Sequence, residues 1–542
     1  MLKSLGNITQ GYLAKSSITL LLVISVGIFA TCALIYQFIC RDGLWYDELC
    51  LAHNLIIRDF YGLFKPLDIS QVSPIMFLLI EKLMLNLSPF NDSLTDYVLR
   101  IYPLCCGLGV VILYYPLIIN ITKSKIIALF AYALLVLNPV FIYYTSEVKQ
   151  YICELFYAVL LLYFWSKPRN KWNLQQCLFM IFLATLGIWN SYTICFVILP
   201  IALWDGWELF RLCRYDVKSF LFTKQLRFYV LQYGAILLML LGYYFVFLYN
   251  HPAQSYMKNF WQVYYDAFIT VSNAVTLIDK DIYFYYGKIP MVFFLLGLLS
   301  MFFLKNKFPV FLAGCLIGVH CLFSYLHVYP ALERFIFYWM VVIPLLLSCL
   351  LYMMLYINKN LRKMIYINAS ICAFTIVVIE ISKISLPIYL YPNNEYPRSA
   401  LKFISENYIP GETVLHQQFL LPNAYIEKYY LLNVDKGDLI PIKIEDGAWL
   451  SVLEQQLEKF GKNKVWLLLP YNTVEEIRNE IDKYTKENDI PLSLDCKRFD
   501  FEWVCLIERN TKHTDISEQN ENNLINNSVS KRMNTTDKLL LD

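Results

Sequence analysis

The chain has 542 residues, of which 58% are hydrophobic, 17% aromatic and 16% charged, and its mean hydropathy is +0.46. A soluble globular domain has about 45–50% apolar and about 25% charged residues, so this composition indicates a membrane protein. The formal net charge is only +3 at pH 7. No basic patch of the kind that binds nucleic acid is evident, and we expect no nucleic-acid partner.

Apolar segments long enough to cross a bilayer recur from Ser17 to Pro387, which makes residues 1–387 a predicted transmembrane domain. A spanning helix needs about 20 such residues, and the first run is too long to be the core of a cleaved signal peptide. We expect about eleven spans, at 17–39, 98–119, 126–144, 151–165, 174–187, 189–209, 229–249, 290–304, 308–326, 335–356 and 365–387. The stretch 174–209 is barely long enough for two of them.

Lysine and arginine gather in five loops that fall on one side of the membrane if both spans of 174–209 are counted. The positive-inside rule makes that side cytoplasmic, together with the N-terminus. The loops 40–97 and 250–289 and the C-terminal region are then outside, in a multi-pass protein of the plasma (inner) membrane. The basic loop residues are Lys123, Lys125, Lys167, Arg169, Lys171, Arg211, Arg214, Lys218, Lys224, Arg227, Lys305, Lys307, Lys359, Arg362 and Lys363.

Residues 388–510 change to a soluble character. Thr413–His416 and Val465–Leu469 are typical of buried strands, and Val474–Tyr484 has helical spacing. We therefore expect a small extracytoplasmic α/β domain. Residues 511–542 are rich in Asn, Ser, Thr and Lys and predict a disordered tail.

Most of the fifteen cysteines fall inside apolar runs, where thiols behave as small hydrophobic groups. Two pairs are exceptions: Cys40 with Cys50 beside the first span, and Cys496 with Cys505 in the C-terminal domain. Either pair could form a disulfide if its side of the membrane is oxidising.

The first outer loop opens with Trp45-Tyr46-Asp47-Glu48, which places two acids a few residues after the first span. An aspartate at the membrane surface could accept the proton of a hydroxyl group as it attacks an anomeric carbon, which is general-base catalysis. The alternative is an interfacial Trp-Tyr belt with solvated acids. Taken alone, the four residues do not decide between the two.

A second polar cluster, Tyr143 to Tyr151, lies at the outer turn between two spans. Its Glu147 and Lys149 are flanked by apolar helix on both sides, which suggests that they face a polar cavity or each other. Lys149 could then neutralise a phosphate. The alternative is a short hairpin with its charges in water.

Arg100 and Arg334 stand near the outer starts of two spans. Basic groups at this depth can bind the phosphate of a lipid carrier and stabilise the charge on a phosphate leaving group. Alternatively, each side chain extends to the lipid headgroups, which is the common outcome for arginine at a helix end.

Two further features belong to the outer loops. Ser73–Leu87 carries Glu81 and Lys82 among large apolar residues, a pattern that suits a helix in the membrane interface. His251 could join an acid in holding a divalent metal, but a single histidine without spaced partners is a weak metal signal.

Taken in order, these motifs resemble the bacterial family 39-like glycosyltransferases of the GT-C superfamily, relatives of the protein O-mannosyltransferases and of the lipid A aminoarabinose transferase. The similarity extends over residues 10–390, and Lys149 stands where the family commonly has arginine. Of the family's two adjacent loop prolines only Pro74 is present. The segments that carry the resemblance are Trp45–Glu48, Gln71–Pro74, Leu99–Pro103, Asn138–Pro139, Tyr144–Tyr151 and Tyr329–Pro330 with Arg334.

The resemblance implies an α-helical GT-C enzyme that moves a sugar, with inversion, from a polyprenyl-phosphate donor to a lipid, glycan or protein acceptor of the cell envelope. It implies no certain cofactor, and a divalent metal stays open. The implied site comprises catalytic Asp47, Glu48 and Glu147, the donor-phosphate ligands Arg100, Lys149 and Arg334, and the substrate contacts Tyr46, Tyr144, Gln150, Tyr151 and Tyr329.

Two other functions are compatible with parts of this pattern. A transporter or flippase of lipid-linked glycans also places charges within spans, but the repeated halves and broken helices typical of transporters are not evident. A structural or receptor role for the outer domain would leave the acids at the membrane rim without an explanation.

Overall fold

The structure is a computed structural model that divides into two compact units, Met1–Lys402 with Leu421–Leu432 and Phe403–Leu420 with Asn433–Asp542. The residues that the structure describes are 2–41, 43–88, 95–167, 173–213, 215–217, 221, 223–249, 251–287, 291–357, 384, 388, 398–417, 439–442, 449–459, 464–470, 474–488, 492–499 and 502–509.

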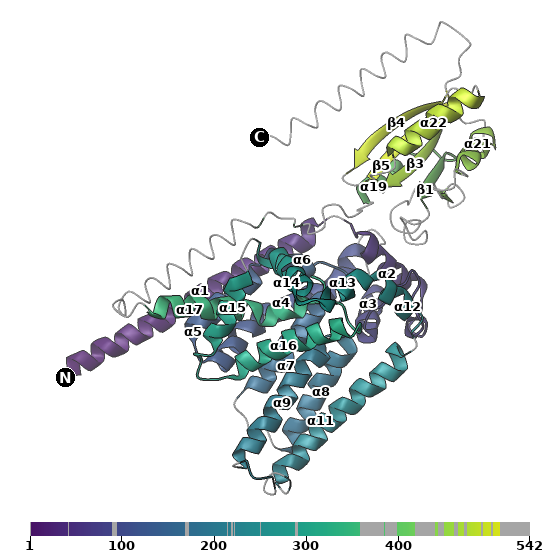
Figure 1. Cartoon of the computed structure of the whole chain (residues 1–542). Coiled ribbons are helices and arrows are strands. Elements are labelled where there is room, and N and C mark those ends of the chain that lie inside the picture. The colour runs from purple at the N-terminus through teal and green to yellow at the C-terminus, as the bar shows by residue number, and fades with distance from the viewer. Residues whose placement is uncertain are drawn as a thin grey trace. The chain divides into compact units, whose positions relative to one another are not determined.

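The first unit is built of helices (Figure 1). Its N-terminal part contains α1 (Leu2–Cys40), α2 (Tyr46–Ile57), α3 (Ile75–Leu87), α4 (Thr95–Thr122), α5 (Lys125–Val136), α6 (Pro139–Tyr144), α7 (Tyr151–Ser166), α8 (Leu174–Asn190) and α9 (Ile194–Leu212). It continues with α11 (Lys224–Tyr243), α12 (Ala253–Phe260), α13 (Gln262–Asp266), α14 (Val271–Tyr286), α15 (Met291–Met301), α16 (Phe308–Tyr325) and α17 (Ile343–Ile357). Short 3-10 or π turns lie at η1 (Gly62–Phe64), η3 (Tyr244–Leu248), η4 (Ala267–Ile269) and η5 (Phe337–Val341).

The helices confirm the predicted polytopic membrane architecture. Within the described ranges, five segments are long and apolar enough to span a bilayer: Ile18–Cys40, Thr95–Thr122, Lys224–Leu248, Phe308–Tyr325 and Phe337–Met354. Shorter apolar helices occupy Lys125–Val136, Tyr151–Ser166, Leu174–Asn190 and Val292–Met301. The stretch 174–209 does contain two helices, α8 and α9. The eleventh predicted span, 365–387, lies outside the described residues.

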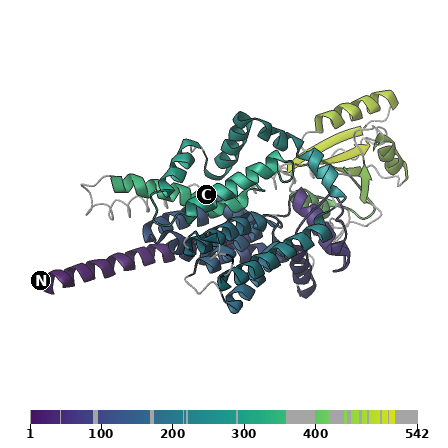
Figure 2. The same cartoon turned by 60° about the horizontal axis from the view of Figure 1, so that its bottom comes forward.

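Helix α4 holds the centre of the first unit. It packs along α1, α5 and α7, and the N-terminal part of α1 projects past the other helices in both views (Figures 1 and 2). At Gly107 the α4 backbone comes so close to the turn between α6 and α7 that an added Cβ would lie 2.3 Å from Cγ2 of the buried Thr145. This close contact sets how near to α4 the turn that carries Glu147 and Lys149 can lie.

The second unit is an α/β domain, as the sequence predicts. Its five-stranded sheet has the order β2-β1-β3-β5-β4, in which β2, β1 and β3 are parallel and β5 and β4 are antiparallel. The strands are β1 (Thr413–Gln417), β2 (Leu439–Ile442), β3 (Lys464–Pro470), β4 (Leu492–Phe499) and β5 (Glu502–Arg509), and the helices are α19 (Arg398–Asn407), which crosses the boundary between the units, α21 (Trp449–Lys459) and α22 (Val474–Asn488).

The core of this domain forms where α21 and α22 cover the sheet. Trp449, Leu467 and Ile477 are almost completely buried there. The strand β3 carries the continuous apolar run Val465–Leu469, a pattern typical of a strand that is covered on both faces. Cys496 and Cys505 face each other on β4 and β5 and form a disulfide. The other pair that the sequence suggested does not form, since Cys40 and Cys50 are free thiols. The predicted tail 511–542 lies outside the described residues.

The contact at Gly107 predicts the outcome of two matched substitutions. Gly107→Ala should destabilise the first unit by about 1–3 kcal/mol, because the new methyl group overpacks Thr145. Gly314→Ala in α16, where an added Cβ meets nothing within 4 Å, should be neutral or slightly stabilising, because alanine is a better helix former. The apparent Tm of the purified protein in detergent measures both, and an equal response of the two variants would contradict the packing argument.

Candidate active site

The site begins at the first turn of α2, directly after α1 ends. Glu48, at the third position of α2, accepts a hydrogen bond from the backbone N–H of Trp45 at 3.1 Å. This contact satisfies an N–H group that the helix itself cannot pair, and the two acids of the first turn suit the positive end of the helix dipole. The local sequence therefore fixes the start of α2, from which the side chains of Asp47 and Glu48 point in different directions.

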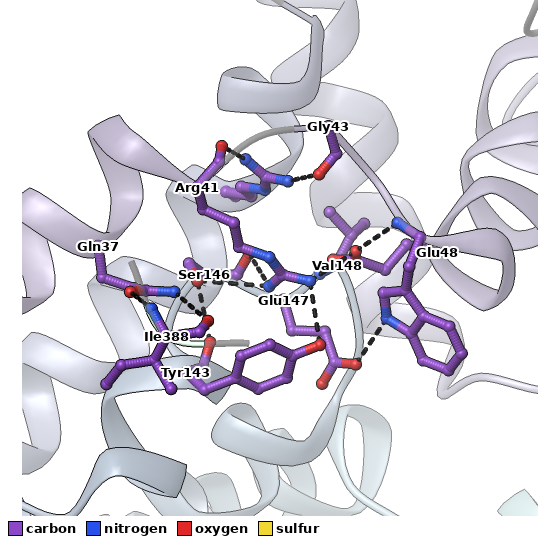
Figure 3. A network of polar contacts seen from close by, with 11 residues as sticks. Gln37, Arg41, Gly43, Glu48, Tyr143, Ser146, Glu147, Val148 and Ile388 are labelled. Carbon is purple, nitrogen blue, oxygen red and sulfur yellow. Dashed lines mark hydrogen bonds and ion pairs between the residues drawn. The ribbon is translucent and has the colours of Figure 1, made fainter. Parts of the chain in front are cut away.

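Glu48 faces the protein interior and forms a buried ion pair with Arg41 (Figure 3). Its Oε2 lies 2.8 Å from a terminal nitrogen of Arg41, and its Oε1 accepts the backbone N–H of Val148 at 2.6 Å. Arg41 also donates to the carbonyl of Ser146 at 2.7 Å and stacks on the ring of Tyr143. The pair thus ties the end of α1 and the start of α2 to the α6–α7 turn.

Arg100 supports this network from α4. It is fully buried, and it donates to the carbonyls of Arg41 at 3.0 Å and of Gly43. The resemblance implies a phosphate ligand at Arg100 and a catalytic acid at Glu48, but both side chains are shielded from solvent and engaged by the protein. Their placement favours a structural role for each.

Asp47 points the other way and gathers polar groups from three distant segments. Its Oδ1 lies 3.2 Å from Nζ of Lys149 and accepts from Nε2 of Gln71 at 3.1 Å. Its Oδ2 lies 3.4 Å from a terminal nitrogen of Arg334. Gln71 also accepts from Lys149 at 2.7 Å. The Asp47 side chain is 25% exposed, so a substrate can reach it.

The charges around Asp47 determine its protonation. Burial by itself raises the pKa of the Asp47 carboxyl, but the charges of Lys149 and Arg334 and the hydrogen bond from Gln71 outweigh this effect. The net result is a pKa below the usual range of an aspartate. Asp47 is therefore ionised at neutral pH and can accept a proton.

Glu147 lies in the protein interior, in a different environment from that of Asp47. It is 1% exposed, its Oε1 accepts from the indole N–H of Trp45 at 3.0 Å, and its Oε2 has no hydrogen-bond partner among the described residues. Burial, together with the nearby charge of Glu48, raises the pKa of Glu147 to about 8, against the opposing effects of Arg41, Trp45 and Lys149. The carboxyl group is mostly protonated at neutral pH, so it does not act as a base there.

The tyrosines of the predicted site pack beside the α6–α7 turn and make few contacts with the polar groups around Asp47. Tyr144 and Tyr151 are buried and meet edge to face at 5.3 Å, and Tyr144 also packs on Phe337. Tyr329 is part-buried and packs on Phe335, next to Arg334. Gln150 is buried and accepts from the hydroxyl of Ser73 at 3.4 Å. The side chain of Tyr46 lies outside what the structure describes.

We call Asp47, Gln71, Lys149 and Arg334 the Asp47 cluster. A cavity of about 200 Å³ adjoins this cluster and shares Gln71 with it, and Ser73 lines the cavity as well. It lies between the loop that leads into α3 and the chain around η3, and most of its lining is apolar or aromatic. Its other polar contributors are Lys65, Tyr192, Tyr243, Tyr249 and His251. Over the ranges that the structure describes, no three His, Cys, Asp or Glu side chains come together as a metal site, so His251 has no such partners there.

Two residues that the sequence analysis did not single out contact the charged groups of this site. Arg41 stands at the end of an apolar span, where it resembles an ordinary interfacial arginine. Trp261 lies in the loop 250–289, and its ring stacks under the guanidinium of Arg334 at 4.9 Å. The position of Arg41 directly after the apolar segment of α1 could have marked it in the sequence. No local pattern marks Trp261.

The buried ion pair predicts a large effect on stability. Glu48→Ala should destabilise the first unit by about 3–5 kcal/mol, because it leaves the Arg41 charge buried without a partner. In the same part of the chain, Asp68→Ala breaks the partly exposed pair with Arg58 and should cost less than about 1 kcal/mol. Thermal unfolding in detergent compares the two, and similar losses would show that the Arg41–Glu48 pair is not the stronger constraint.

The pKa of Glu147 predicts a stability difference that depends on pH. The folded chain keeps this proton up to about pH 8, whereas the unfolded chain releases it near the ordinary value of 4.5, so stability is lost as the pH rises between these values. Glu147→Gln cannot ionise and should escape that loss. The Tm of the variant minus that of the wild type should therefore increase from about pH 5 to about pH 8, and a constant difference would contradict the assignment.

No protein-family model and no curated protein matches the chain. The fold is similar to the crystal structure of ArnT from Cupriavidus metallidurans bound to undecaprenyl phosphate, with 9% identity and a TM-score of 0.48 over 90% of this chain and 97% of that chain. It is also similar to ArnT from Cupriavidus metallidurans in the apo state, with 10% identity and a TM-score of 0.45 over 91% of this chain and 98% of that chain. Both TM-scores lie below 0.5, so we derive the function from the site residues alone.

Proposed function

We propose that this chain is a membrane glycosyltransferase that moves a sugar from a polyprenyl-phosphate donor to a hydroxyl group of a cell-envelope acceptor. The observation that supports it is the Asp47 cluster, in which one accessible carboxylate is held by Lys149 and Arg334 beside a cavity lined by both apolar and polar groups. An amphiphilic substrate with a phosphate head fits both parts of such a site.

The two cations suit a phosphate leaving group. As the glycosidic bond breaks, negative charge develops on the phosphate, and preorganised cations stabilise that charge in a poorly solvated site. Lys149 is 6% exposed and Arg334 19% exposed, so little water competes with a substrate for either group. Arginine adds a planar pair of donors that matches phosphate oxygens.

Asp47 is the proposed general base. It takes the proton of the acceptor hydroxyl while that oxygen forms a bond to the anomeric carbon, and the polyprenyl phosphate leaves with the electrons of the old bond. A phosphate that draws Lys149 and Arg334 away from Asp47 also removes the charges that depress its pKa. Donor binding would therefore make Asp47 a stronger base.

A single displacement of this kind inverts the anomeric configuration. It needs one base and no covalent intermediate. Glu48 is too deeply buried to serve as a nucleophile, and Glu147 is mostly protonated at neutral pH. Both acids fit better as supports of the turn that carries Lys149.

We place the site and the C-terminal α/β domain at the outer face of the plasma membrane, with the N-terminus in the cytoplasm. The disulfide Cys496–Cys505 supports this orientation, because structural disulfides persist in oxidising compartments. The α/β domain then serves the recognition of an envelope lipid, glycan or protein acceptor.

The proposal predicts the effect of Asp47→Asn on transfer. The purified protein is supplied with undecaprenyl-phosphate sugars and an envelope extract, and consumption of the lipid-linked donor is followed. Loss of a general base should lower kcat about 10²- to 10⁴-fold. Asp59→Asn alters an exposed acid of the same loop and should leave the rate unchanged.

Two outcomes would count against this assignment. An Asp47→Asn variant that is as fast as the wild type would move the base to another acid. No turnover with any donor would favour a flippase of lipid-linked glycans, which translocation of a labelled carrier in vesicles would test.

A further inference from the structure

Helix α14 lies in the predicted outer loop 250–289, where the sequence analysis singled out His251 but no residue of this helix. Two of its residues, Asp281 and Tyr285, are four positions apart and so lie on the same face of the helix. They are 1% and 3% exposed, whereas Tyr283 between them is 51% exposed. The inner face of α14 therefore carries a carboxyl and a hydroxyl group into the protein.

Both groups bind the backbone of one residue, Glu333. The Tyr285 hydroxyl donates to the Glu333 carbonyl, and the Glu333 N–H favours the charged form of the Asp281 carboxyl and so lowers its pKa. A residue held at both its amide and its carbonyl cannot rotate without losing one of these two interactions. α14 thus fixes the orientation of the chain at this point.

The next residue is Arg334. The stretch between α16 and η5 has no regular helix or strand, so contacts such as those to Glu333 determine where the side chain of Arg334 points. The guanidinium lies over the rings of Trp261 and Phe335, at 4.9 Å and 5.6 Å, and reaches Oδ2 of Asp47 at 3.4 Å.

The same end of α14 also contacts the other half of the site. Asn138 donates from Nδ2 to the Tyr285 carbonyl at 2.8 Å, and its Oδ1 accepts from the N–H of Val140 at the start of α6. Helix α6 leads directly into the turn that carries Lys149. Tyr285 therefore links the two segments that supply the cations of the Asp47 cluster.

We propose that Asp281 and Tyr285 are positioning residues that hold the Glu333 peptide and thereby aim Arg334 at Asp47. The catalytic consequence rests on the proposed transferase function, but the contact itself does not. Neither residue touches the proposed substrates, since both act through Glu333.

The chemistry of Asp281 identifies a conservative variant. Burial, strengthened by the Glu333 carboxylate and opposed by Lys280 and the Glu333 N–H, raises the pKa of Asp281 to about 8. The carboxyl is thus mostly neutral at pH 7, and either form offers an oxygen to the amide. Asparagine, which is neutral and of the same shape, should preserve the contact.

Backbone hydrogen exchange of the full chain in detergent, read by mass spectrometry on peptides that cover residues 331–336, tests the contact without any substrate. Asp281→Ala and Tyr285→Phe should accelerate exchange there about fivefold or more, because each removes a hydrogen bond that restrains this backbone. Asp281→Asn should restore protection. Asp279→Ala and Tyr283→Phe, which change exposed side chains of the same helix, are the matched controls.

Kinetics test the consequence for Arg334. If Tyr285→Phe acts by displacing Arg334, the KM for the donor rises and the acid limb of the pH profile moves to higher pH, because Asp47 loses a neighbouring positive charge. The double variant Tyr285→Phe/Arg334→Ala should then be no slower than Arg334→Ala alone.

Exchange that is unchanged in Asp281→Ala and Tyr285→Phe would overturn the proposal. So would losses of activity that add up in the double variant, because they would separate Tyr285 from Arg334. A wild type without turnover would refute the transferase function, and the exchange measurement would still decide whether α14 holds the Glu333 peptide.

Discussion

The ion pair between Arg41 and Glu48 has no solvent exposure, and the geometry of the whole site depends on it. Removing two charges from water is costly, and their attraction offsets that cost only where further hydrogen bonds complete the site. Here Ser146, Val148 and Tyr143 supply those bonds. The pair joins α1, α2 and the α6–α7 turn, so Asp47 and Lys149 are held at a fixed separation by elements that are distant in the sequence.

Asp47 and Glu48 show how burial separates the roles of two adjacent acids. A single step along the helix turns Glu48 into the protein, where both its oxygens are engaged, and leaves Asp47 at the surface of the cluster. Glu147 is a third case, because it is as buried as Glu48 but has only the Trp45 indole as a hydrogen-bond donor in the described structure. Its pKa rises accordingly, and the proton stays with it near neutral pH.

The two cations of the cluster reach Asp47 by different routes. Lys149 is carried by a turn that Gly107 and Thr145 hold against α4. Arg334 lies in the irregular segment between α16 and η5, and its guanidinium stacks on Trp261. The preceding residue, Glu333, interacts with α14 through both its backbone groups. The segment that carries Arg334 has no regular secondary structure of its own. Its position therefore depends on contacts with α14, a helix outside the Asp47 cluster.

Apolar run length and local periodicity are enough to predict the membrane character, the helices of the described spans and the small α/β domain. The sequence also marked Asp47, Lys149 and Arg334 as charges kept at the membrane rim. Packing in three dimensions was needed to establish that Arg100 donates to backbone carbonyls and that Cys40 and Cys50 stay apart. The same holds for the contacts of Arg41, Trp261 and α14, because the direction of a side chain and its partners depend on packing between segments that are not adjacent in the sequence.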